Sequence, residues 1–271
     1  MNGEALQALE ATSRTFFLPI ARLPEGLREA VGSAYLCMRA IDEIEDHTEL
    51  QGAIKAKLLR AISWIFQAQS SIENFAHDEL NTLFQDYLNV LPEVTVQIGE
   101  WACQAPKFIA PRIWEATAAM ADRMAQWAAT GWKIFTSADL DRYTYGVAGA
   151  VGLVLCDIWA WFEKVQINRT HAIQFGRGLQ AVNILRNRDE DLSRGIDFFP
   201  DGWHKEDMHE YAQKNLEGFN QYAESLPNNS FTNFVQIPRV LAFATLDVLA
   251  RGGKKLTRQK VLEIVREIEE K

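Results

Sequence analysis

Residues 23–41 read LPEGLREAVGSAYLCMRAI, and apolar side chains recur there every three or four positions. This spacing places them on one face of an α-helix. A second run of this kind, residues 80–91, stops at Pro92, a residue type that cannot continue a helix. The alternation typical of strands is rare, and its best example is the short run Val94-Thr95-Val96. The pattern predicts an all-α protein of about eight to twelve helices.

The composition indicates a globular protein. The chain has 271 residues, of which 48% are hydrophobic and 24% are charged. These proportions are ordinary, and the length allows a well-filled core. Because no linker rich in serine and glycine and no internal repeat interrupts the sequence, we predict one domain over residues 1–271. The net charge of −8 argues against a nucleic-acid partner.

Cysteine usage and the apolar stretches suggest a cytoplasmic protein. Cys37, Cys103 and Cys156 show no paired spacing, which points to a reducing compartment. The first residues contain no basic stretch leading into an apolar run, so we expect no signal peptide. Residues 143–162 are apolar enough for a membrane span, but Asp157 lies within them. We therefore expect a buried core helix there.

An acidic cluster follows the first helical run directly. Residues 42–46 read DEIED, and Asp42 and Asp46 share one face of a helix, about 6 Å apart along its axis. Glu45 lies beside them. Stacked carboxylates raise each other's pKa unless a cation lies between them. A solvated helix end is the simpler interpretation of one such cluster, but the residues before this cluster are apolar.

A second polar cluster occurs late in the chain. Residues 183–191 read NILRNRDED. Asn183, Asn187 and Asp191 are spaced by four, so their oxygens form one stripe over two helical turns, with Gln180 on nearly the same face. Such hard oxygen ligands suit Mg²⁺, which takes its remaining ligands from water and phosphate. Two helices of this kind could hold Mg²⁺ ions that bind one diphosphate. Arginines beside the clusters supply local positive charge: Arg39, Arg186 and Arg188.

The order of four motifs resembles the squalene/phytoene synthase family over nearly the whole chain. The motifs are Ser13-Arg14-Thr15-Phe16, Tyr35 with Arg39-x-x-Asp42-x-x-Glu45-Asp46, Tyr143-x-Tyr145-Gly146-Val147-Ala148-Gly149, and Gln180-x-x-Asn183-Ile184-Leu185-Arg186-Asn187-x-x-Glu190-Asp191 with Arg194-Gly195. The resemblance implies an all-α isoprenoid-synthase bundle around one deep central cavity. It also implies Mg²⁺ as cofactor and farnesyl or geranylgeranyl diphosphate as substrate, with farnesyl diphosphate the expected one.

The resemblance further implies roles for single residues. The implied catalytic residues are Asp42, Asp46, Asn187 and Asp191, and the implied metal ligands are these four with Glu45 and Asn183. The residues implied to bind substrate are Ser13, Thr15, Phe16, Tyr35, Arg39, Tyr143, Gln180, Asn183, Arg186 and Arg194. In the family, Mg²⁺ acts as a Lewis acid while the allylic C–O bond breaks. A second prenyl diphosphate then attacks the carbocation.

Four positions depart from the family pattern, one of them Thr245, near which a tyrosine is expected. Asn187 stands where the synthases carry the first aspartate of the second motif, and Ile196 and Phe198 replace a frequent arginine and tyrosine. An amide oxygen can bind Mg²⁺ but brings no negative charge, so metal affinity should fall. We therefore favour ionisation of farnesyl diphosphate followed by water capture. The products would be farnesol and pyrophosphate, a farnesyl diphosphate phosphatase activity.

Other functions stay open. The competing enzymatic interpretation is head-to-head condensation of two farnesyl diphosphates to squalene or dehydrosqualene. A non-catalytic binder of prenyl lipids is a third possibility. A di-iron bundle needs two Glu-x-x-His pairs, and only Glu206-x-x-His209 is present. Lys254 and Lys255 could add positive charge or belong to a solvated tail. An apolar product implies transient contact with a membrane surface. Prenyl chain length, reductant use and oligomeric state are left open by the sequence.

Overall fold

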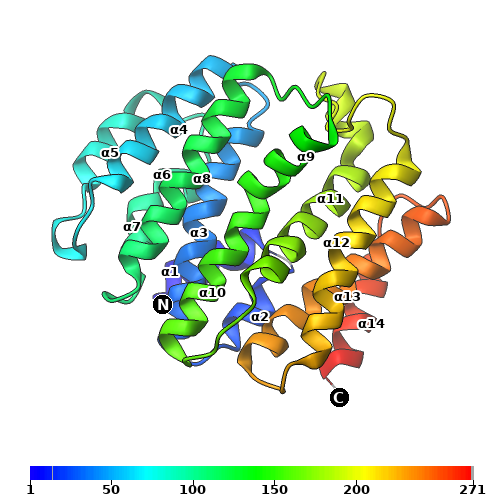
Figure 1. The fold of residues 1–271 in the computed structure, drawn as a ribbon. Helices are drawn as coiled ribbons and strands as arrows, with labels where there is room; N and C mark the ends of the chain where they lie inside the picture. Colours follow the sequence, from blue (N-terminus) through cyan, green and yellow to red (C-terminus); the bar gives the residue numbers. More distant parts are fainter. Residues whose placement is uncertain (14, 270–271) are drawn as a thin grey trace. The chain divides into compact units, whose positions relative to one another are not determined.

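All the regular structure in the computed structural model, which describes residues 1–13 and 15–269, is helical. The α-helices are α1 (Gly3–Thr12), α2 (Phe17–Ala21), α3 (Leu27–Asp46), α4 (Gly52–Gln67), α5 (His77–Phe84), α6 (Glu93–Val96), α7 (Ile98–Cys103), α8 (Ala110–Thr130), α9 (Ser137–Thr144), α10 (Ala150–Phe162), α11 (Arg169–Ser193), α12 (Lys205–Ser225), α13 (Ser230–Ala250) and α14 (Arg258–Glu269) (Figure 1). Two short 3₁₀ segments, η1 (Ile72–Asn74) and η2 (Gln85–Tyr87), and a π-helix, η3 (Tyr145–Gly149), complete the list. The predicted all-α fold is confirmed, although the described α-helices outnumber the expected eight to twelve.

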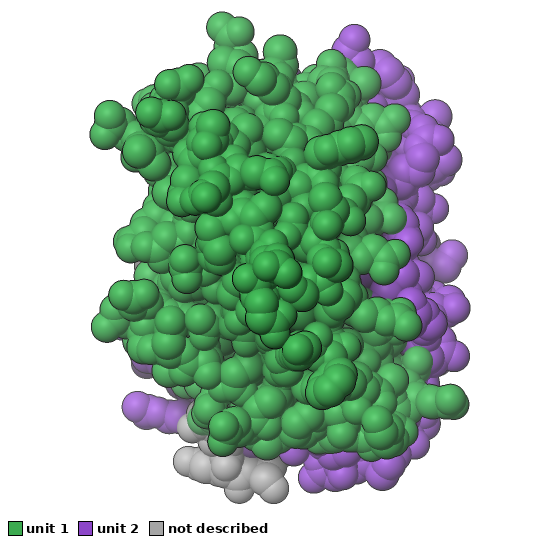
Figure 2. All heavy atoms as spheres, turned by 90° about the vertical axis from the view of Figure 1, so that its left-hand side faces the viewer, with its two compact units in different colours: residues 1–132, 154–167 green, residues 133–153, 168–271 purple. Residues whose placement is uncertain are grey.

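The contacts divide the chain into two compact units. Unit 1 comprises residues 1–132 and 154–167, and unit 2 comprises residues 133–153 and 168–271 (Figure 2). The chain passes from unit 2 into unit 1 within α10. The single domain over residues 1–271 stays a prediction, and each unit is described by itself.

The core of unit 1 contains an antiparallel pair, α4 and α8. Near the start of α4, a Cβ added to Gly52 would lie 2.6 Å from the carbonyl oxygen of Ala128, near the end of α8. Nearer the other end of α4, the hydroxyl of Ser63 donates to the carbonyl of Ala118 at 2.8 Å. Position 52 therefore needs a residue without a side chain, because a larger one would push the two helices apart.

Helix α3 packs on α6 and α7 and is the element that carries the first acidic cluster. Its first turn is fixed by Glu29, whose Oε2 accepts from the backbone N–H of Gly26 at 2.5 Å. Two buried hydroxyls tie α3 to its neighbours: Ser33 donates to the carbonyl of Trp101 at 2.7 Å, and Thr95 donates to the carbonyl of Ala40 at 2.9 Å. These bonds fix the position of α3 against α6 and α7 at two levels.

In unit 2, α11 lies against η3 and α12 (Figure 1). A Cβ on Gly176 would lie 2.4 Å from the carbonyl oxygen of Ala148, and one on Gly152 would lie 2.4 Å from that of Ala172. The approach of these backbones depends on glycine on both sides of the contact. On the side facing α12, the ring of Phe175 stacks on that of Phe219, with centroids 4.2 Å apart.

Two helical stretches are long and apolar enough to cross a membrane by length and composition alone. They are Ser137–Phe162 and Ser230–Ala250, and 44% of each apolar window is buried within the protein. Core helices of globular proteins meet the same criterion, so this is weak evidence for a membrane span. Within the first stretch, the side chains of Ile158 and Trp159 are fully buried, in agreement with the expected core helix.

Candidate active site

The first acidic cluster occupies the last turn of α3. Arg39 lies one turn earlier, and its two terminal nitrogens form ion pairs with Asp42 and Glu43. The Asp42 side chain keeps 31% of its surface exposed, and Asp46 is also exposed. The α-helical register thus presents two carboxylates one turn apart, with a guanidinium beside them, as the sequence predicted.

Glu45 differs from the two aspartates because it is directed into the protein. It is 5% exposed, and the indole Nε1 of Trp132 donates to its Oε1. Lys55 donates to the backbone carbonyl of Glu45 at 2.6 Å, and its Nζ lies 4.9 Å from the centroid of the Trp132 ring. One oxygen of Glu45 already accepts a hydrogen bond inside the protein. Glu45 is therefore better placed to hold the acidic cluster in position than to bind a ligand.

The electrostatics of the cluster favour a bound cation. Burial raises the pKa of Asp42 to about 7, the charge of Asp46 adds to the rise, and Arg39 opposes it. The partial exposure of Asp42 means that solvent screening moderates this shift. Burial likewise raises the pKa of Glu45 to about 8, with Asp46 and Asp42 contributing. Carboxylates that hinder each other's ionisation are stabilised when a divalent cation neutralises them.

Several of the predicted substrate-binding residues in unit 1 lie together. Tyr35 donates to the carbonyl of Thr12 at 3.2 Å, and its ring lies 5.9 Å from that of Phe16. Ser13 is 4% exposed, and its hydroxyl accepts from the backbone N–H of Phe16 at 2.9 Å. Burial raises the pKa of Tyr35, while Ser13 and the nearby Arg39 oppose the rise.

Two residues of the opening motif are less well defined by contacts. Thr15 is partly exposed, and its binding role stays a prediction. Arg14, the second residue of that motif, lies outside the described residues.

The second cluster lies on α11 in unit 2. Asn187 and Asp191 both contact an arginine, since Arg186 Nε donates to Asn187 Oδ1 at 3.2 Å and Arg194 Nη2 donates to Asp191 Oδ1. Asp191 is 5% exposed, whereas Asn183 is exposed. The predicted stripe is therefore present on one helix, with its final carboxylate already held by Arg194.

Tyr143 and the altered position 198 are in contact. Tyr143 on α9 is 3% exposed, and its ring stacks on that of Phe198 with centroids 4.7 Å apart. Gln180 is partly exposed one turn before Asn183. The phenylalanine that departs from the family pattern thus has a packing role, and the substrate-binding roles of Tyr143 and Gln180 stay predictions.

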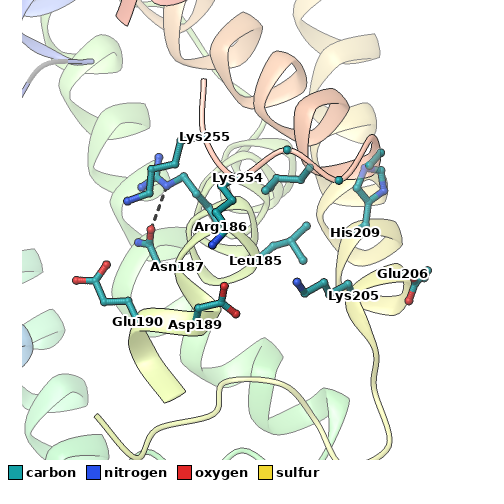
Figure 3. Close-up of a pocket in the computed structure, with 14 residues that line it drawn as sticks. Leu185, Arg186, Asn187, Asp189, Glu190, Lys205, Glu206, His209, Lys254 and Lys255 are labelled. Carbon is teal, nitrogen blue, oxygen red and sulfur yellow. Dashed lines mark hydrogen bonds between the residues drawn. The ribbon is translucent and has the colours of Figure 1, made fainter. Parts of the chain in front are cut away.

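A cavity of about 620 Å³ opens beside the second cluster (Figure 3). It is lined by Leu185, Arg186, Asn187, Asp189, Glu190, Lys205, Glu206, His209, Leu249, Ala250, Gly252, Gly253, Lys254 and Lys255. Lys254 and Lys255 are exposed and line the same cavity as Arg186 and Asn187, and their role in anion binding stays a prediction. Lys205 also lines the cavity, and it could not be predicted because no local sequence pattern connects the start of α12 with α11.

The residues fit a magnesium ion held by few protein ligands. Among the described residues, no group of three or more His, Cys, Asp and Glu side chains converges. Asp42 and Asp46 supply two carboxylates on one helix turn, and Mg²⁺ commonly takes one or two carboxylates, with water and phosphate oxygens completing its octahedron. The two clusters belong to different units, so the apolar central cavity expected between them stays a prediction.

Comparisons with known proteins agree with these features. The model of the squalene/phytoene synthase family matches residues 9–210. Squalene synthase from Schizosaccharomyces pombe is 30% identical, and the match covers 91% of this chain and 59% of that protein. Squalene synthase from Yarrowia lipolytica is also 30% identical, and the match covers 91% of this chain and 61% of that protein. The chain thus spans about three fifths of the length of these relatives.

The fold has a match among solved structures. A complex of TcSQS with the ligand E5700 aligns with a TM-score of 0.74 and 24% identity, covering 96% of this chain and 84% of that one. The chain belongs to the squalene/phytoene synthase family, which confirms the resemblance.

Proposed function

We propose that this protein is a prenyltransferase that ionises farnesyl diphosphate with Mg²⁺ and joins two such molecules head to head to a C30 product. The squalene synthases that are 30% identical over nine tenths of the chain carry this proposal. They favour condensation, the alternative in the sequence analysis, over water capture. The acidic cluster on α3 is consistent with the same chemistry.

Asp42 and Asp46 would hold the metal in this scheme. When bound, Mg²⁺ neutralises the diphosphate and stabilises the charge that the departing pyrophosphate gains. Glu45 would keep the end of α3 in place through Trp132 and Lys55, which contact it from outside the helix. Arg39 would orient Asp42, to which it is paired, and would add positive charge near the leaving group.

The residues of α11 would bind diphosphate and metal within unit 2. Asn183, Asn187 and Asp191 would supply the oxygen ligands there, with Arg186 and Arg194 adjacent to two of them. Breakage of the allylic C–O bond leaves a prenyl carbocation and pyrophosphate. The double bond of a second prenyl diphosphate supplies the electron pair for the new C–C bond, and exclusion of water protects the cation until then.

Water capture is kept as a second candidate because of Asn187. This residue brings no charge to the metal, and its carbonyl oxygen already accepts from Arg186. Weaker metal binding at the second cluster would hold the acceptor molecule less firmly, and water would then reach the cation to give farnesol.

One incubation tests both candidates. The full chain is purified and incubated with farnesyl diphosphate and Mg²⁺, with and without a reduced nicotinamide dinucleotide, and the organic extract is analysed by mass spectrometry. A C30 hydrocarbon or a C30 diphosphate as the main product supports condensation. Farnesol as the main product supports water capture instead and overturns the main proposal.

The matched variants separate catalysis from simple lipid binding. Asp42→Asn should lower product formation by about a hundredfold or more. Glu49→Gln, which removes an exposed carboxylate just beyond the helix, should not. Metal-independent binding of farnesyl diphosphate without turnover would indicate a prenyl-lipid binder. A cytoplasmic location with transient contact to a membrane surface, where the apolar product would leave, belongs to the same proposal.

A further inference from the structure

Three reactive side chains form a row in unit 1, outside the acidic cluster of α3. The Sγ of Cys103 lies 3.5 Å from Nε2 of His77. On the other side of the imidazole, Nδ1 of His77 lies 3.5 Å from Oε1 of Glu100. A thiol, an imidazole and a carboxylate are thus within reach of one another in that order.

Local structure explains why they meet. Glu100 and Cys103 are three residues apart on α7, so they lie on the same side of that helix. His77 is the first residue of α5, and the ring of Phe75 contacts its imidazole edge to face, with centroids 5.4 Å apart. Gly99 supplies the space, because a Cβ at that position would lie 2.9 Å from Nδ1 of His77.

This order is that of an activated nucleophile, in which a base contacts the nucleophile and a third group orients the base. Burial and the charge of Glu100 raise the pKa of the Cys103 thiol to about 11, so the sulfur carries its proton at neutral pH. The thiol therefore depends on a neighbouring base to react. His77 is the group within reach that can accept the proton.

The cysteine is also accessible, in contrast to the two others. Cys103 is partly exposed, whereas Cys37 is fully buried and Cys156 is 4% exposed. The His77 side chain keeps 39% of its surface exposed. A small molecule can therefore approach the pair from solvent.

We propose that Cys103 is a site of thiol–disulfide exchange with low-molecular-weight disulfides, with His77 as its general base. Sγ of Cys103 attacks one sulfur of the disulfide, a new S–S bond forms, and the old one breaks. The thiol proton moves to Nε2 of His77 and then to the departing thiolate. The products are a mixed disulfide on Cys103 and one free thiol. Exchange at sulfur develops no oxyanion, so a base and an open approach suffice.

The test measures the rate at which oxidised glutathione modifies the full-length protein. Mass spectrometry should find the adduct on Cys103, and Cys103→Ser should remove it. His77→Gln should slow the reaction at neutral pH by at least about tenfold, as expected for loss of a general base. His171→Gln, which removes a histidine of α11, is the matched control and should react at the wild-type rate.

The pH profile separates base catalysis from mere exposure. His77 faces Glu100 of α7 and shares its helical turn with Asp78 and Glu79. At neutral pH the wild type should react faster than His77→Gln, whereas the two rates should converge towards the pKa of the thiol, where the thiolate needs no base. Far-UV circular dichroism checks that the variant is folded, and Glu100→Gln, at a side chain that is 63% exposed, should slow exchange less.

Two results would overturn the proposal. One is an equal rate for the wild type and His77→Gln, which would leave accessibility as the only determinant. The other is an adduct on Cys37 or Cys156 that forms as fast as that on Cys103. Neither result bears on the prenyltransferase proposal, because none of the three residues belongs to the acidic clusters.

Discussion

Trp132 donates its indole N–H to Glu45, 87 positions earlier in the chain. The bond distinguishes this glutamate from the other acids of the cluster, because Glu45 is 5% exposed while Asp42 and Asp46 reach solvent. Burial makes this carboxylate costly to ionise, and the bond from Trp132 offsets only part of that cost. We therefore expect Glu45, together with Asp42, whose pKa is also raised, to set the pH behaviour of the metal-free protein, and the two aspartates to set its metal dependence.

Stability of the metal-free protein should fall as the pH rises. The pKa of Glu45 is raised from 4.5 to about 8, so the folded state binds a proton that the unfolded state releases. This contribution is fully present below pH 4.5 and is lost as the pH rises through about 8. Urea unfolding in a chelator at several pH values measures it.

Glu45→Gln is the variant that checks this assignment. It should reduce the difference in unfolding free energy between these pH limits by on the order of 2–4 kcal/mol. Glu49→Gln should leave the difference unchanged. An unaltered pH dependence in Glu45→Gln would contradict the assignment.

Turnover should depend on the aspartates of α3 and on the metal. Asp42→Asn and Asp46→Asn each remove one charge from the cluster, and each should lower kcat by about a hundredfold or more while the helix content is retained. A chelator should abolish the wild-type activity, and added Mg²⁺ should restore it. Activity within a few-fold of wild type in both variants would refute the metal-binding role.

Asn187→Asp should strengthen the metal dependence of the second cluster. A new carboxylate close to the metal adds an attraction of about 1 kcal/mol or more, so half-saturation by Mg²⁺ should occur at about a tenfold lower concentration. Asn81→Asp adds the same charge at an exposed position of α5, outside both clusters, and should leave this concentration unchanged. The measurement is a Mg²⁺ titration of product formation, and an unchanged half-saturation in Asn187→Asp would remove Asn187 from the metal site.

Close packing of α11 on η3 should make Gly176 intolerant of substitution. The Cβ of Gly176→Ala would lie 2.4 Å from the backbone oxygen of Ala148, and overpacking of this kind costs about 1–3 kcal/mol. Gly3→Ala adds the same methyl group where nothing lies within 4 Å, and it should be neutral or slightly stabilising. Urea midpoints compare the two, and equal midpoints would contradict the close approach.

The position of α3 was predicted well, because the apolar spacing that defines its buried face can be read from neighbouring residues in the sequence. Residues 23–41 show the periodicity, and the helix runs from Leu27 to Asp46, so it includes the acidic cluster. The start is later than the pattern suggested because Gly26 has a φ of 86°, which an α-helix does not allow. The spacing of Asp42 and Asp46 on one face followed from this register.

Other elements depended on tertiary contacts and were predicted less well. The run at 80–91 was expected to be helical up to Pro92, but α5 ends at Phe84 and Leu88 is 55% exposed. The candidate strand around Val94 is the short helix α6. There, Thr95 is bonded to the backbone of α3, a contact that its sequence neighbours do not encode. The link between Glu45 and Trp132 is equally remote from any local pattern.

The most direct measurement is the ratio of pyrophosphate released to C30 product formed when the purified protein acts on radiolabelled farnesyl diphosphate with Mg²⁺. Condensation predicts that label leaves the aqueous phase as a C30 compound, with no more than two pyrophosphates released for each. Farnesol formed with one pyrophosphate per molecule, and no C30 compound, would contradict the proposed function.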